Sequence, residues 1–189
     1  SVVSRAHVLR PEMRDHVDAE WKALNPTNAR PVLALHMRGT DKASNRHPVP
    51  PSEFEPYVTS FFAAFPAGRI FVATESRAYS DIVSKAWRAK HGHERVLLCN
   101  ISTRIDGRRS NAMTYRDKQM QVMLDVFTDI QLMAKADYFL HSASSVAEAV
   151  IYTNAHLHAK SVDLEYRHNA TRDAPWLGAA TRRYGVPRV

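Results

Sequence analysis

The chain is poor in cysteine and has no long apolar segment. Its 189 residues include one cysteine, Cys99, which excludes an internal disulfide and any metal site built from several cysteines. Uninterrupted apolar runs are only a few residues long, whereas a helix that spans a membrane needs about 20. No basic segment leads into an apolar one after Ser1, so no signal peptide is visible. These absences indicate a globular domain without a membrane span, and they leave the cellular compartment open.

Glycine is also scarce, and the common phosphate-binding motifs built from it are missing. The 6 glycines form neither the dinucleotide fingerprint nor the phosphate-loop lysine motif, so ordinary NAD enzymes and NTPases lose support. The histidine pairs at His91 and His93 and at His156 and His158 lack the further ligands that a metal ion requires. We therefore expect no metal site and no bound cofactor.

Positive charge is what the chain has in excess. Lysine and arginine total 26 against 19 aspartate and glutamate, a net charge of +7, which favours an anionic partner. Nucleic acid, a phosphorylated ligand and an acidic surface all satisfy this condition. Nucleic acid is the least favoured of the three, because the chain shows neither aromatic stacking signatures nor a recognised binding motif.

Short apolar runs alternate with segments of helical periodicity, which is the pattern of a parallel α/β sheet. The runs are nearly continuously apolar, as expected where helices cover both faces of the sheet. We predict an α/β fold, a Rossmann-like doubly wound parallel sheet of about five strands, in a single domain over residues 1–189. The predicted strands are residues 32–37, 70–73, 96–99, 138–140 and 161–164.

Helices are predicted between these strands. The sequences from Ser52 to Glu55 and from Ser145 to Glu148 match capping boxes, with Ser52 and Ser145 as N-caps, and Gly92 should end the helix between them. Residues 1–30 are predicted to be a helical lead-in with a helix at 11–24, and residues 166–189 an irregular tail. A long helix is predicted over about 116–136, with an apolar stripe of Met123, Val126, Phe127, Ile130, Met133 and Ala134.

Polar side chains concentrate directly after the first predicted strand, where open α/β sheets bind ligands. His36 and Arg38 would point to the same face of an extended chain. Arg38 can bind a phosphate through two parallel hydrogen bonds, His36 can donate to a phosphate or ribose, and Asp41 can hold Arg38 or Lys42 in place. The alternative is a strand end that is merely stabilised by an Arg–Asp pair.

The fourth predicted strand leads into serines at the start of a helix. Ser144 and Ser145, together with the backbone N–H groups of a helix N-terminus, form a natural anion site. Simple capping is the alternative, since serine is a preferred N-cap. The site at Ser144 and Ser145 falls at the same edge of the sheet as Arg38, which favours the anion site.

Asp129 lies at the border of the apolar stripe of the long helix, while Asp125 points further toward solvent. A carboxylate that is partly buried needs a partner, because burying it unpaired is costly. Two explanations stay open: Asp129 accepts hydrogen bonds from a ligand, or it is satisfied by neighbouring backbone or by Arg38.

Three segments resemble, in order, the α-1,6-fucosyltransferase and its relatives, which include the bacterial Nod-factor and the protein O-fucosyltransferases. Residues 36–42 resemble the family's His-x-Arg-x-x-Asp-Lys motif. Residues 71–75 resemble its second strand and acidic turn, and residues 129–137 followed by Ser144 and Ser145 resemble the stretch that closes the donor site. The resemblance covers residues 30–165.

The resemblance implies a GT-B-type glycosyltransferase, whose C-terminal Rossmann-like half binds GDP-fucose and transfers fucose, without a metal, to a glycan or protein hydroxyl. Arg38 would be the catalytic residue that holds the β-phosphate and assists its departure. A eukaryotic member would act in the Golgi or endoplasmic reticulum lumen and a bacterial one in the cytoplasm. The implied substrate-binding residues are His36, Asp41 and Lys42 for the nucleotide-sugar, Asp129 for the guanine or its surroundings, and Ser144 and Ser145 for the phosphates.

Two departures from the α-1,6 branch are visible. Gly39 stands where that branch has a second arginine, and Arg46 stands where it has the glutamate that serves as its base. A GT-B enzyme also has two Rossmann-like halves, and we expect these residues to supply one, with a missing half or a partner subunit completing it. The competing interpretation is a catalytically inactive domain that binds a protein within a larger assembly.

Overall fold

The computed structural model describes residues 9–39, 48–99, 103–105 and 116–165. Two of the residues that the sequence assigns to the ligand, Asp41 and Lys42, lie outside the described residues. The predicted tail at 166–189 lies outside them as well.

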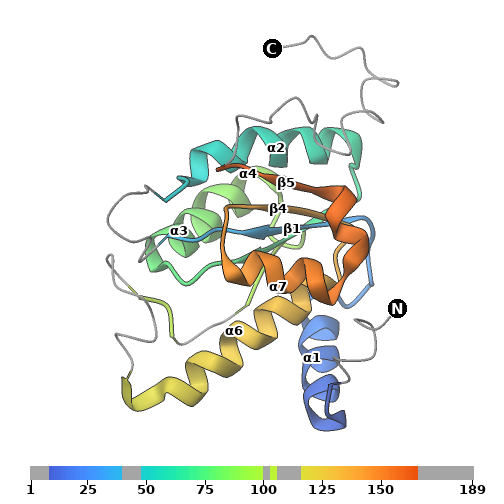
Figure 1. Ribbon diagram of the computed structural model, residues 1–189. Helices are drawn as coiled ribbons and strands as arrows, with labels where there is room; N and C mark the ends of the chain where they lie inside the picture. The colour runs from blue at the N-terminus through green and yellow to red at the C-terminus, as the bar shows by residue number, and fades with distance from the viewer. Residues whose placement is uncertain (1–8, 40–47, 100–102, 106–115, 166–189) are drawn as a thin grey trace.

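Five parallel strands form one sheet in the order β3-β2-β1-β4-β5 (Figure 1). The predicted α/β fold with a doubly wound parallel sheet is confirmed, and each predicted strand is correct to within one residue at either end. The chain adds β2 and β3 on one side of β1 and then returns to add β4 and β5 on the other side. The strands are β1 (Val32–His36), β2 (Arg69–Ala73), β3 (Val96–Leu98), β4 (Tyr138–His141) and β5 (Ser161–Asp163).

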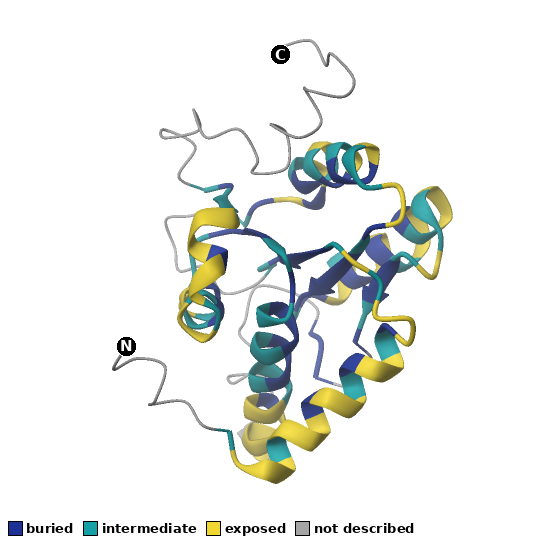
Figure 2. Cartoon of the chain, turned by 90° about the vertical axis from the view of Figure 1, so that its right-hand side faces the viewer, coloured by how far each residue is buried: buried dark blue, intermediate teal, exposed yellow. Residues whose placement is uncertain are grey.

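Helices cover both faces of this sheet, so the strands are buried while exposed residues lie on the outer helical surfaces (Figure 2). One face packs against α2 and the helical segment after β2, and the other packs against α1, α6 and α7. The helical segments are α1 (Pro11–Leu24), α2 (Pro51–Ala64), α3 (Arg77–Ile82), the π-helix η2 (Val83–Trp87), α4 (Arg88–His91), the 3₁₀ turn η3 (Arg116–Lys118), α6 (Gln119–Ala134), α7 (Ser145–Thr153) and the 3₁₀ segment η4 (Ala155–Lys160).

Alternating residues of β1 supply the two halves of the core. Leu33 and Leu35 join the cluster under α2, whereas Val32 and Ala34 join the cluster under α1 and α6. In the second cluster Trp21 of α1 meets Phe71 of β2 edge to face, with ring centroids 6.4 Å apart. The helix predicted at residues 11–24 is thus confirmed, and it packs on the face of the sheet that includes Val32 and Ala34 of β1.

The two predicted capping boxes are wrong, for different reasons. Helix α2 begins at Pro51, after an N-cap at Pro50 without a side-chain bond, because proline at the first position already has a helical φ and needs no donor. Ser52 is therefore inside the helix and exposed. At α7 the N-cap is Ser144, one residue earlier than predicted, and its hydroxyl accepts from Ala147 N–H. The stop at Gly92 is confirmed: its φ is +98°, which glycine adopts without strain.

The apolar stripe predicted for α6 is only partly correct. Met133 is fully buried, but Met123 is 66% exposed, and the buried positions also include Val122 and Leu132. Figure 1 shows the reason, since the N-terminal half of α6 extends away from the sheet. The periodicity of the sequence therefore predicted the helix correctly, but it did not predict which part of the helix is buried against the rest of the protein.

Phe71→Ala should reduce the free energy of unfolding by about 3–5 kcal/mol, because it leaves a cavity between β2 and Trp21. Urea unfolding followed by circular dichroism measures this. Met120→Ala, at a position 71% exposed on α6, is the matched control and should change stability by about 0.5 kcal/mol or less. Equal effects of the two substitutions would contradict the assigned core.

Candidate functional site at the carboxyl edge of the sheet

The strand order reverses between β1 and β4. In open α/β sheets ligands bind at the carboxyl ends of the two strands where this happens, because the connections leave the two strands in opposite directions. His36 and His141 are paired in register as the last residues of β1 and β4. The residues that follow them, up to Gly39 on one side and Ser144 on the other, therefore lie at the candidate site.

His36 and Ser144 are in contact at this edge of the sheet. Nδ1 of His36 lies 3.2 Å from Oγ of Ser144, although the two residues are 108 positions apart in the sequence. Oγ of Ser144 already accepts from Ala147 N–H at 3.0 Å, so its own proton can be donated to Nδ1. In the neutral ring this leaves the proton on Nε2. Two segments that the sequence assigned separately to the ligand are thus joined by one hydrogen bond at the start of α7.

Arg38 is half-buried and lies two residues beyond the end of β1. The next residue, Gly39, packs so closely on the turn after β2 that an added Cβ would lie 2.5 Å from Cβ of Ser76. Its N–H donates to the Glu75 carboxylate at 3.0 Å. Position 39 therefore has no room for a second arginine, which gives a steric reason for the departure from the α-1,6 pattern.

Ser145 has a different role from Ser144. It is the exposed first residue of α7, and no side-chain cap depends on it. Ala143, on the other side of the cap, donates its N–H to Glu165 at 3.0 Å, which fixes the turn between β4 and α7. Ser144 is thus the serine held in place by hydrogen bonds, to His36 and to Ala147 N–H, and Ser145 is the next residue, at the N-terminus of α7.

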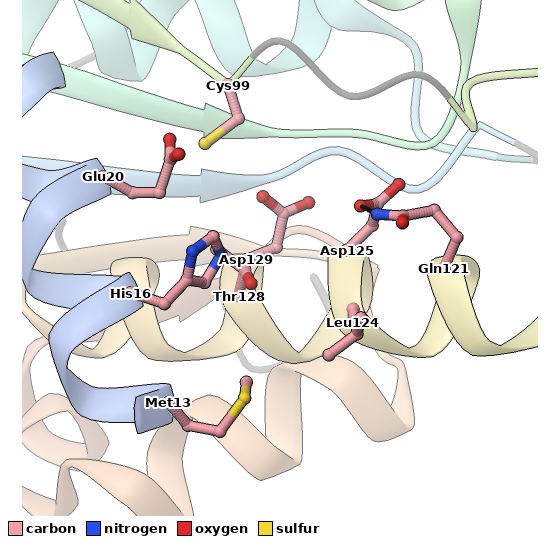
Figure 3. A pocket seen from close by; sticks show the side chains of 9 residues that line it. All are labelled: Met13, His16, Glu20, Cys99, Gln121, Leu124, Asp125, Thr128 and Asp129. Carbon is pink, nitrogen blue, oxygen red and sulfur yellow. Dashed lines mark hydrogen bonds between the residues drawn. The ribbon is translucent and has the colours of Figure 1, made fainter. Parts of the chain in front are cut away.

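Asp129 lies apart from this contact, on α6, where it lines a cavity of about 630 Å³ below the end of β3 (Figure 3). The residue is 9% exposed, and its Oδ1 is buried without a hydrogen-bond partner among the residues that the structure describes. Burial raises the pKa of Asp129 to about 8, while the positive charge of Arg104 opposes that increase. The prediction that Asp129 is partly buried is confirmed, and Arg104 is a cation whose charge acts on it.

Two buried groups at this edge were not identified as site residues from the sequence. Arg104, 9% exposed, donates from Nε to the Thr74 carbonyl and from Nη2 to the Cys99 carbonyl, so it joins the ends of β2 and β3. His141 stacks on Phe139 with ring centroids 4.6 Å apart, and burial lowers its pKa. The available signals were an arginine cluster after the third strand and a histidine that ends the fourth.

Cys99 lines the same cavity but is not suited to act as a nucleophile. It is 7% exposed, and burial raises the pKa of its thiol far above its ordinary range. In the described structure its side chain forms part of the cavity wall next to the end of β3.

Comparisons with known proteins add no relative: no family model matches the chain, and no curated protein matches it. Within residues 9–39, 48–99, 103–105 and 116–165, no group of three or more His, Cys, Asp or Glu side chains is arranged to hold a metal ion. No described helix is long and apolar enough to cross a membrane.

Ser144→Ala should reduce the free energy of unfolding by about 1 kcal/mol, because it removes the α7 cap and the contact with His36. Ser145→Ala should change it by about 0.5 kcal/mol or less, since that side chain is exposed. Chemical denaturation of the two variants side by side measures the difference. Equal losses would show that the cap is misplaced.

The contribution of Asp129 to the free energy of unfolding should fall as the pH rises from about 4 to 8. In this window the unfolded chain has released the Asp129 proton, at the ordinary pKa of 3.8, whereas the folded protein still holds it up to about pH 8. Asp129→Asn should flatten this dependence, by about 1.4 kcal/mol per pH unit at most. Urea unfolding at several pH values from 5 to 8 measures it, with Asp117→Asn, an exposed carboxylate, as control. Identical slopes in the wild type and Asp129→Asn would refute the assignment.

Proposed function

We propose that this chain is the nucleotide-sugar-binding domain of a fucosyltransferase-like glycosyltransferase, with GDP-fucose as the donor. The observation that carries the proposal is the hydrogen bond between His36 and Ser144 at the point where the strand order reverses. It joins the two segments whose sequences resemble the donor-binding motifs of that family. The acceptor is a glycan or protein hydroxyl.

In this proposal the donor's diphosphate lies between the end of β1 and the start of α7. The N-terminus of this nine-residue helix favours negative charge, and the hydroxyls of Ser144 and Ser145 lie beside it. Arg38 would bind the β-phosphate and neutralise it as the bond to the sugar breaks, which is the role that a metal ion has in other transferases. Asp41 and Lys42 would complete the phosphate side of the site.

The guanine would lie toward Asp129. The cavity beside Asp129 has the volume of a small-molecule site, and its carboxylate offers a buried oxygen without a partner to the N–H groups of a base. A purine that presents two adjacent donors would satisfy it, and a base that presents an acceptor there would not. Selection of guanine over adenine follows from that difference.

A second candidate is the inactive domain that binds a protein. It is favoured by the exposed apolar side chains on the projecting half of α6, Met120, Met123 and Leu124. Such side chains are common at protein-binding surfaces. This candidate requires no bound nucleotide, which separates it from the first.

GDP should raise the melting temperature of the chain, because a ligand that binds only the folded state stabilises it. At about 100 times its Kd, GDP would add about 2.7 kcal/mol to the free energy of unfolding, which corresponds to a rise of roughly 5–10 °C. ADP should have a smaller effect at the same concentration. Differential scanning fluorimetry with millimolar GDP and ADP measures both.

Arg38→Ala should abolish the GDP shift while the variant without ligand melts close to the wild type. Arg69→Ala is the matched control, since Arg69 lies at the opposite end of the sheet, where it donates to Thr27. The control should keep the shift. Absence of any GDP shift in the wild type would overturn the proposal in favour of the protein-binding domain.

A further inference from the structure

The cavity beside Asp129 has walls that come from two different helices. One wall is a face of α1, where Met13, His16 and Glu20 follow each other at steps of three and four residues. The other wall is a face of α6, and Figure 3 shows side chains of both helices extending into the space between them. Because Glu20 and Asp129 line the same cavity from different helices, a single ligand that fills it can contact both carboxylates.

Three carboxylates line this cavity, and they differ in whether they already accept hydrogen bonds. Both oxygens of Asp125 do, because Thr103 donates to Oδ2 at 2.5 Å and Gln121 donates to Oδ1 at 2.7 Å. Oδ1 of Asp129 is buried and has no donor among the described residues. Glu20 is half-buried, and within the part of the chain that the structure describes it forms neither a hydrogen bond nor an ion pair. Glu20 and Asp129 are therefore the two carboxylates that can accept N–H groups of a ligand.

Contacts on either side of Glu20 hold its backbone in place at the cavity. Two residues before it, Asp18 forms an ion pair with Lys135, which follows α6, and their Oδ1 and Nζ atoms are 2.6 Å apart. The residue after it, Trp21, is buried and packs edge to face on Phe71 of β2. Helix α1 is thus fixed against both α6 and the sheet, so the Glu20 side chain extends into the cavity from a rigid element.

We propose that Glu20 is a specificity-determining residue for the base of the donor, and that it accepts one N–H of the exocyclic amino group of guanine. This inference rests on the proposed function for the identity of the ligand. Guanine presents a ring N–H beside an amino group, and the two oxygens of Asp129 can accept the ring N–H and the nearer N–H of the amino group. The other N–H of the amino group points away from Asp129 and would be buried unpaired without a second acceptor, which is costly. Glu20 supplies that acceptor from α1.

The test compares GDP with inosine diphosphate (IDP), whose base keeps the ring N–H and lacks the amino group. Calorimetric titrations at a pH of about 8.5 keep Asp129 largely ionised, because its pKa is about 8. Glu20→Ala should weaken GDP binding about tenfold, since a hydrogen bond to a charged group is lost. The affinity for IDP should stay within about twofold of the wild type, because IDP has no N–H to donate to Glu20.

Glu12→Ala is the matched control, because it removes the same side chain from an exposed position of α1 that does not line the cavity. It should leave both affinities unchanged. Glu20→Met keeps a side chain of similar length without an oxygen, so it should reproduce the selective loss of GDP binding, and it decides the test if Glu20→Ala does not fold. Damaged packing or an altered cavity charge would change GDP and IDP binding together, because the two ligands differ only in the amino group.

Equal weakening of GDP and IDP binding in Glu20→Ala or Glu20→Met would overturn the inference, and so would GDP binding that neither substitution changes. Either result, obtained with a wild type that binds GDP, would reject the role of Glu20 and leave the proposed function standing. Absence of GDP binding to the wild type would reject the proposed function and, with it, the role of Glu20.

Discussion

The register between β1 and β4 is the constraint on which the candidate site depends. It is fixed at the far end of the two strands by Asp137, whose Oδ2 accepts from Val32 N–H at 2.8 Å and from Arg30 at 3.0 Å. Asp137 also donates its own N–H to the Val32 carbonyl at 2.9 Å. Because side chains alternate along a strand, a slip of one residue would turn His36 to the other face. The contact between His36 and Ser144 is therefore set by an aspartate at the opposite edge of the sheet.

The carboxyl edge of the sheet divides into two electrostatic environments. Around β1 and β4, the start of α7, Arg38 and neutral hydroxyls favour an anion. Near the end of β3, the cavity is lined by the acidic residues Glu20, Asp125 and Asp129, and Arg104 is buried. A nucleotide has the complementary polarity, because its phosphates are negative and a guanine edge presents donors. The net charge of +7 alone does not predict this division, since a sum says nothing of placement.

Much of the fold could be predicted from the sequence, because buried parallel strands are short apolar runs and helices show their own period. The errors have local causes. Pro51 begins α2 without the help of Ser52, and Ser144 rather than Ser145 is the cap because its backbone is extended, with φ of −165°. At the site, the burial of Asp129 was predictable from its helix, but the positive charge that acts on it was not. Arg104 comes from a segment without periodicity, and no local pattern in the sequence indicates which cation acts on a given carboxylate.

The close approach of Gly39 to Ser76 makes those two positions interdependent under mutation. Any side chain at position 39 meets both Cβ and Oγ of Ser76 and also the Tyr79 ring, 3.1 Å from an added Cβ. Ser76 is the N-cap of α3, so replacing it would destabilise that helix. A larger residue at position 39 would require the side chain of Ser76 to be removed or displaced. That change would weaken the N-cap of α3. Position 39 is thus held to glycine by the N-cap of a neighbouring helix, and any redesign of this position has to begin at Ser76.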